Sequence, residues 1–138
     1  MKPMFVDTAP IIYLLEGDTA RRERVRRFLD RSLSQDVPLC ASVVTLAEVL
    51  VPAKRVGDAA WVQRCLCALH DLLSFPLRPI DAQVAEWAAS IRGQYGFRLP
   101  DAMQLAAALA MGCDRFYTND RALRGFDAID VVLVDETE

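Results

Sequence analysis

The chain has 138 residues, of which 53% are apolar and 25% charged, so one core can bury roughly 68% of its unfolded surface. This composition excludes a disordered or fibrous chain, and a net charge of −3 excludes a protein that coats nucleic acid by bulk attraction. We therefore expect a single domain over residues 1–138, cytoplasmic and without a membrane span. The four cysteines are too few for a disulfide framework, so reduced core thiols are expected.

The first half of the chain predicts two strands, each followed by helices. We expect a strand at Met4–Val6 and then a helix that Thr8 caps and that runs to about Leu15. A longer helix over residues 19–33 is expected to turn inward its row of Val25, Phe28, Leu29 and Leu33. A strand at Leu39–Ala41 leads to a helix from about Thr45, which Pro52 should bend or end. The helix beyond Gly57 has an expected inward row of Trp61, Cys65, Leu69 and Leu72.

The second half continues the alternation of strands and helices. We expect a brief edge strand at Leu77–Ile80, and then a helix capped by Asp81 whose inward residues are Val84, Trp87, Ala88 and Ile91. An alanine-rich helix from Pro100 to Gly112 precedes a strand at Arg115–Thr118, a helical turn at Arg121–Gly125 and a last strand at Val131–Val134. Strands separated by helices require right-handed parallel crossovers. The predicted fold is α/β, a three-layer α/β/α sandwich with a central parallel sheet.

Four carboxylates follow predicted strands or lie near the start of predicted helices: Asp7, Glu48, Asp101 and Asp120. In a parallel sheet, all four should face the edge where the strands end. Two charges about 4 Å apart repel by about 4 kcal/mol at an effective dielectric of 20, so we expect a cation to share the site. An all-oxygen donor set suits Mg²⁺ or Mn²⁺. Such ions activate water for phosphodiester hydrolysis, so that chemistry needs no protein nucleophile.

Each acid also has a structural interpretation. Glu48 stands three residues after Thr45, the spacing of a capping box. Asp101 is an acid in a first helical turn, and Asp120 is a natural turn former. Asp7 is hardest to explain in this way, because a charge beside a buried strand is costly unless it is paired or liganded. The metal hypothesis requires Asp7 and Asp101 to lie on the same side of the molecule, with neither locked to an arginine.

Four segments together resemble the PIN-domain ribonucleases, especially the VapC-type toxins of bacterial toxin–antitoxin systems: Asp7-Thr8, Thr45–Val49, Leu99–Ala108 and Tyr117–Asp120. The resemblance implies a Mg²⁺- or Mn²⁺-dependent endoribonuclease that forms a homodimer and is held inactive by a cognate antitoxin. It implies that the catalytic, metal-binding acids are Asp7, Glu48, Asp101 and Asp120. The supporting residues that it implies are Thr8, Thr118 and Asn119.

Arginine makes up fourteen of the sixteen basic residues, and six arginines lie between Arg21 and Arg31. Arg24, Arg27 and Arg31 follow one flank of the predicted helix, where they either contact RNA or a protein partner or simply solvate the helix.

The sequence leaves one alternative to nuclease activity and disfavours two others. A PIN-like scaffold that binds RNA or protein without cutting is the alternative, although such a scaffold would be expected to lose acids. Phosphotransfer through an aspartyl phosphate is disfavoured, because Ala9 stands where that chemistry requires a second aspartate. No glycine-rich turn follows the first strand, which argues against a dinucleotide site.

Overall fold

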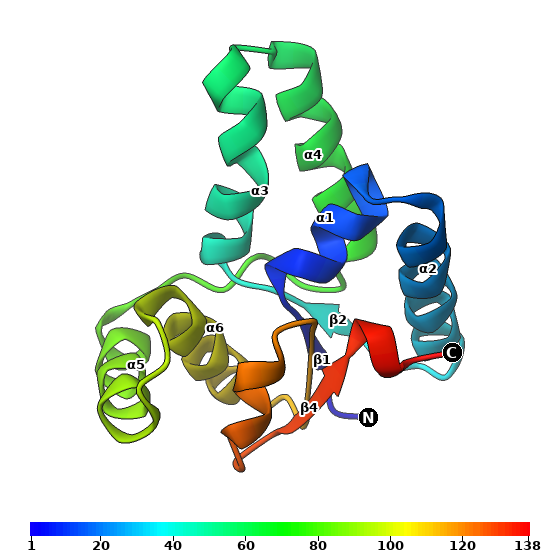
Figure 1. The fold of residues 1–138 in the computed structure, drawn as a ribbon. Helices are drawn as coiled ribbons and strands as arrows, with labels where there is room; N and C mark the ends of the chain where they lie inside the picture. The colour runs from blue at the N-terminus through cyan, green and yellow to red at the C-terminus, as the bar shows by residue number, and fades with distance from the viewer.

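A computed structural model describes residues 1–138, in which a four-stranded parallel sheet lies between two layers of helices (Figure 1). The strands are β1 (Met4–Val6), β2 (Leu39–Cys40), β3 (Arg115–Thr118) and β4 (Asp130–Leu133), in the order β2-β1-β3-β4. All neighbours are parallel, and Val6 of β1 lies opposite Tyr117 of β3. The predicted three-layer α/β/α sandwich is confirmed.

Alternation along the short strands divides the core into two halves. Phe5 and Phe116 point to one face and stack with their ring centroids 5.2 Å apart, under α5 (Ala82–Tyr95) and α6 (Leu99–Ala110). Val6 and Tyr117 point to the other face. That face is covered by α1 (Thr8–Glu16), α2 (Thr19–Ser34), α3 (Val43–Val56) and α4 (Ala59–Leu72).

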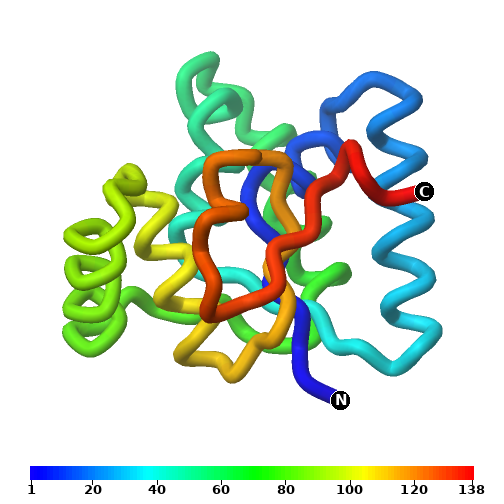
Figure 2. The backbone as a smooth tube through the Cα atoms, turned by 60° about the horizontal axis from the view of Figure 1, so that its bottom comes forward, coloured from blue at the N-terminus to red at the C-terminus, as the bar shows by residue number.

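Two 3₁₀ turns complete the chain, η1 (Arg121–Gly125) and η2 (Val134–Glu136). Helices α3 and α4 form a hairpin that projects from the sheet, and the C-terminal segment that contains η2 lies beside α2 (Figures 1 and 2). None of the helices has the length and apolar character needed to cross a membrane. Three of the cysteines are buried as predicted, whereas Cys67 is exposed.

Two helices begin at residues other than those predicted. Asp7, not Thr8, caps α1, because its carboxylate accepts a hydrogen bond from the backbone N–H of Thr8. Ser42 caps α3, which therefore begins before Thr45. Pro52 does not end α3, which continues to Val56 because residues on both sides of the proline, Val49 and Ala53, are buried in the core.

Three other details of the prediction are wrong. Leu77–Ile80 forms no strand and makes only a single bridge between Arg78 and Ser42, since Pro76 before the segment and Pro79 within it have no N–H to donate. Leu33 is exposed because Ser32 takes the next inward position of α2 after Leu29. Trp87 is also exposed, and the smaller Ala88 is buried in the core between the sheet and the α5–α6 layer.

Candidate active site

The candidate site lies where β1 and β3 end. From β1 the chain passes through α1 and α2 to β2 at one edge of the sheet. From β3 it passes through η1 to β4 at the opposite edge. Adjacent strands whose connections diverge in this way leave a crevice beyond their carboxyl ends. The backbone N–H of Asp7 donates to the carbonyl of Tyr117 across a distance of 2.9 Å, so Asp7 and Thr118 are neighbours at this crevice.

Asp7 is buried without a positively charged partner. Its carboxylate accepts hydrogen bonds from the Thr8 backbone N–H at 2.8 Å, the Thr118 hydroxyl at 2.8 Å and the Gln104 amide at 3.2 Å. Burial raises the pKa of Asp7 from 3.8 to about 6, even though these three donors lower it. The charge of Asp101 raises the pKa further. Asp101 and Gln104 both belong to α6, and Gln104 contacts Asp7, so both acids lie on the same side of the molecule.

The pKa of Asp7 predicts how stability depends on pH in the absence of metal. Because the folded carboxyl holds its proton up to about pH 6 and the unfolded one releases it near 3.8, Asp7 favours folding most below pH 4, and this contribution is lost as pH rises to about 6. The expected loss is on the order of 3 kcal/mol. Urea unfolding of chelator-treated protein at several pH values measures it. Asp7→Asn is the control and should lack this component, and identical pH profiles would contradict the assignment.

Glu48 joins the site through a neighbour of Asp7. The hydroxyl of Thr8 donates to Glu48 Oε1 at 2.7 Å, which brings α3 to the start of α1. The capping-box interpretation of Glu48 is wrong, because Ser42 is the cap of α3 and Thr45 instead accepts a hydrogen bond from Gln104. The Glu48 side chain therefore does not cap the start of α3 and instead contacts Thr8 of the site.

Asp101 lies in the first turn of α6, as predicted, and 16% of its side-chain surface is exposed. Asp101 does have an arginine neighbour, which bears on the metal hypothesis: Arg98 Nε is 3.3 Å from Asp101 Oδ2. The Arg98 side chain is 79% exposed, and an ion pair with such a partner contributes little and is easily exchanged for solvent or another ligand. Asp101 is therefore paired but not locked.

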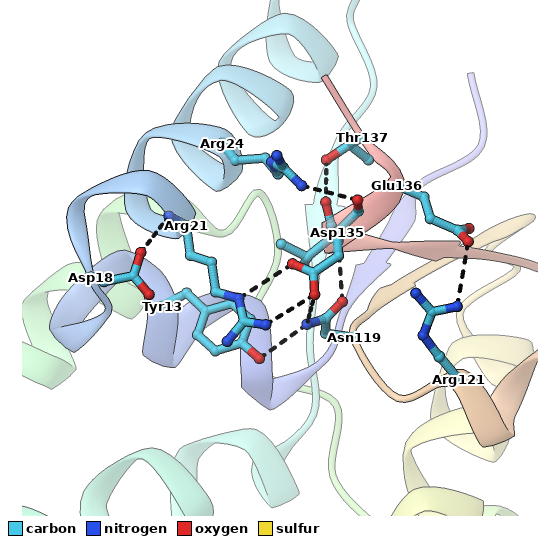
Figure 3. A network of polar contacts seen from close by, with 10 residues as sticks. Tyr13, Asp18, Arg21, Arg24, Asn119, Arg121, Asp135, Glu136 and Thr137 are labelled. Carbon is cyan, nitrogen blue, oxygen red and sulfur yellow. Dashed lines mark hydrogen bonds and ion pairs between the residues drawn. The ribbon is translucent and has the colours of Figure 1, made fainter.

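Asp120 and Asn119 follow Thr118 but differ in orientation. The carboxylate of Asp120 caps η1 by accepting from Ala122 N–H, so the turn-forming role is present, and its own N–H donates to the Thr118 hydroxyl that binds Asp7. The Asn119 side chain instead donates to Tyr13 and Asp135 (Figure 3). Asn119 therefore makes no side-chain hydrogen bond to any of the four candidate acids.

The three arginines predicted to contact RNA or a partner, Arg24, Arg27 and Arg31, have different surroundings. Arg24 donates to the backbone carbonyl of Asp135, and the Arg31 guanidinium lies 6.0 Å from the ring centroid of Phe28. Arg27 is exposed on α2. None of the three is placed among the four acids.

Gln104 is the site residue that the sequence analysis missed. It is 1% exposed and accepts from the Ser42 hydroxyl. Its amide nitrogen lies 2.7 Å from the Thr45 hydroxyl oxygen and also within hydrogen-bonding distance of Asp7 and Thr8. The available signal was one polar side chain on the otherwise apolar inward face of α6, one turn after Asp101. Gln104 thus connects α6, α3 and the start of α1.

The donor chemistry fits a hard divalent cation. The buried charge of Asp7 is met only by neutral donors, and the neighbouring acids offer oxygen atoms alone. No three acidic, histidine or cysteine side chains are grouped closely enough to form a ready-made metal cage. Mg²⁺ commonly binds through one or two carboxylates together with water and substrate phosphate, so a complete protein cage is not required.

Comparisons with known proteins agree with this architecture. The PIN domain family model matches residues 4–130. A toxin–antitoxin complex from Klebsiella pneumoniae contains a chain with 27% identity and a TM-score of 0.72, and the match covers 96% of this chain and 98% of that one. FitAcB from Neisseria gonorrhoeae gives 24% identity and a TM-score of 0.71, covering 96% and 99%.

A third structure extends the fold comparison to much lower identity. VapBC2 from Rickettsia felis, bound to a DNA fragment from its promoter, gives 13% identity and a TM-score of 0.76, covering 94% and 97%. No curated protein matches the chain in sequence. Because the family model spans nearly the whole chain and the fold agrees with it, the chain belongs to the PIN domain family.

Proposed function

We propose that this protein is a Mg²⁺- or Mn²⁺-dependent endoribonuclease and the toxin of a toxin–antitoxin pair. PIN domains are generally nucleases, and the chain belongs to that family. The observation that carries the proposal is the buried Asp7 carboxylate, which has no cationic partner and lies near Asp101 at the end of β1. An uncompensated charge of this kind is costly to folding and is suited to binding a cation.

The residues divide the proposed work between them. Asp7 and Asp101 would hold the cation, with Glu48 and Asp120 contributing from the rim of the site. A divalent ion bound there supplies an activated water and neutralises charge on the phosphate. Thr118 orients the Asp7 carboxylate through a 2.8 Å hydrogen bond, and Thr8 orients Glu48 at 2.7 Å. Gln104 holds the hydroxyl groups of Ser42 and Thr45 on α3 in place.

The proposed partners are an RNA substrate, a cognate antitoxin and a second copy of the chain, in the cytoplasm. Support for the antitoxin comes from the structural neighbours, which include toxin–antitoxin complexes whose chains match over nearly their whole length. The homodimer and the location rest on the family resemblance alone.

Incubation of purified protein with total RNA tests the proposed activity. We expect RNA fragments to accumulate with Mg²⁺ or Mn²⁺ and not with a chelator, because the negatively charged carboxylates repel an RNA phosphate unless a cation lies between them. Asp101→Asn should remove cleavage and weaken metal binding measured by calorimetry. Glu86→Gln, at an exposed position of α5, makes the same acid-to-amide change and should leave both unchanged.

The same experiment separates the nuclease from a non-catalytic PIN-like scaffold. The scaffold is favoured by one observation, that the acids form no ready-made metal cage. It predicts that the protein binds no divalent metal and that RNA stays intact under every condition. Metal-dependent cleavage that survives in Asp101→Asn would instead show that the acids are wrongly assigned.

A further inference from the structure

A second cluster of charges lies between α2, the end of β3 and the C-terminal segment (Figure 3). Its centre is the Asp135 carboxylate, which Arg21 contacts through Nε at 3.3 Å and Nη2 at 2.9 Å. Asn119 donates to the same carboxylate at 3.2 Å, and its side-chain oxygen accepts from the Asp135 N–H at 3.1 Å. Arg24 donates to the Asp135 carbonyl at 2.9 Å.

Two more arginines meet the next acid of the same turn. Arg121 and Arg124 of η1 both form ion pairs with Glu136. The carboxylates of these two acids of η2 therefore pair with three arginines from two different parts of the chain, and Arg24 adds a contact to the Asp135 backbone. The hydrogen bond from Arg21, followed by the one from Asn119, lowers the pKa of the Asp135 carboxyl from its ordinary value.

The cluster adjoins the candidate site through the chain itself. Asn119 stands between Thr118, which binds Asp7, and Asp120, and its amide also contacts the Tyr13 hydroxyl of α1 at 3.2 Å. The residue that follows the Asp7-binding Thr118 is therefore part of the cluster, so a nucleic-acid strand bound at the acids would pass the end of β3 from which the cluster begins. In the free protein, acidic side chains pair with the arginines there.

We propose that Arg21, Arg24 and Asn119 form a binding site for an RNA backbone phosphate, which Asp135 occupies until RNA displaces it. The inference rests on the proposed ribonuclease function. A bidentate guanidinium with an adjacent amide suits any oxyanion that presents two oxygens, whether carboxylate or phosphate. The Arg21 and Asp135 side chains are 42% and 36% exposed, so their pair is weak enough to exchange. The C-terminal turn thus acts as an internal competitor of the substrate.

The test measures the affinity of each variant for a labelled mixed-sequence single-stranded RNA, in an Asp101→Asn background that prevents cleavage. Asp135→Asn should tighten binding about three- to tenfold, because the competing charge is removed. Arg21→Ala should weaken binding by a similar factor, because a phosphate contact is lost. Both variants lose the same ion pair, so a purely structural pair would shift their affinities in the same direction.

Matched controls remove the effect of net charge. Glu23 and Arg26 form an exposed ion pair on the same helix, 4.0 Å apart, so Glu23→Gln and Arg26→Ala repeat the two charge changes away from the cluster. We expect each to change affinity less than twofold. The proposal is overturned if Glu23→Gln and Arg26→Ala change the RNA affinity as much as Asp135→Asn and Arg21→Ala do. An unchanged RNA affinity of Asp135→Asn overturns it as well.

The outcomes also separate this proposal from the proposed function. Wild-type protein that fails to cleave RNA contradicts the nuclease assignment, whatever the variants bind. Wild-type protein that cleaves RNA, with Asp135→Asn lowering the unfolding temperature but leaving RNA affinity unchanged, overturns the phosphate site alone. That result would assign the C-terminal turn to stability, or to contact with a protein.

Discussion

Replacing Asp7 with asparagine is expected to abolish RNA cleavage and, without metal, to make the protein more stable at neutral pH. Burial raises the pKa of this carboxyl to about 6, so at pH 7 the folded protein contains a buried negative charge that lowers its stability. Removing the charge should stabilise the fold by on the order of 3 kcal/mol, which corresponds to a rise of roughly 10 °C in the thermal midpoint.

The hydrogen bonds of Asp7 explain why asparagine should fit. The Asp7 oxygen that caps α1 accepts from Thr8 and Gln104, and an asparagine oxygen can accept from both. The other oxygen binds the Thr118 hydroxyl, which can rotate to accept from the new amide. The fold should therefore remain, while one metal ligand loses its charge.

Activity should fall by more than about a hundredfold, since even losing a residue that only orients a metal ligand typically costs ~10–100-fold. Scanning calorimetry with a chelator and RNA cleavage with Mg²⁺ measure the two effects on the same preparation. Glu86→Gln controls for the change from acid to amide. A variant that is less stable than wild type without metal would show that the Asp7 charge is compensated in the folded protein.

How much of this could be predicted from the sequence depends on whether a feature is local. The run Met4–Val6 followed by Asp7 predicts both a strand and an acid at its end, and the structure has β1 over these residues with Asp7 directly after it. Asp81 before α5 and Gly96 after it mark a helix with ordinary local signals, and the structure confirms them. Such features depend on residues only a few positions apart.

The features that were missed depend on contacts between distant segments. Asn119 was assigned to the acids, but it turns to Asp135, sixteen residues away, because the final strand brings that acid beside it. Trp87 and Ala88 were both predicted to face inward, but only Ala88 is buried, because the packing of α5 on the core decides between adjacent positions that periodicity alone does not resolve. Gln104 has four partners that are 59 to 97 residues distant in the chain.

Replacing Gln104 with leucine is the second change expected to have a large effect, and it should impair both stability and activity. The substitution removes an acceptor from the Ser42 hydroxyl and a donor from the Thr45 hydroxyl, all in a region without solvent. Buried polar groups that lose their partners cost about 1–3 kcal/mol each. We expect the free energy of unfolding to fall by about 2–4 kcal/mol, measured by urea denaturation.

The exposed Gln94 of α5 supplies the matched control, because Gln94→Leu makes the same substitution outside the core. It should change the free energy of unfolding by less than about 0.5 kcal/mol. An equal loss of stability in both variants would mean that helix propensity or solubility, and not the buried hydrogen bonds, explains the result.

The effect of Gln104 on Asp7 distinguishes a positioning residue from a purely structural one. The Gln104 amide is one of the donors that lower the pKa of Asp7 against the effect of burial, so its loss should raise that pKa further and move the pH-dependent step in stability upward. Cleavage assayed well below the unfolding temperature should still fall, with its pH profile displaced in the same direction. If Gln104→Leu loses stability but keeps the wild-type pH profile, Gln104 only holds the helices together. A displaced profile means instead that it sets the charge of the carboxylate on which metal binding depends.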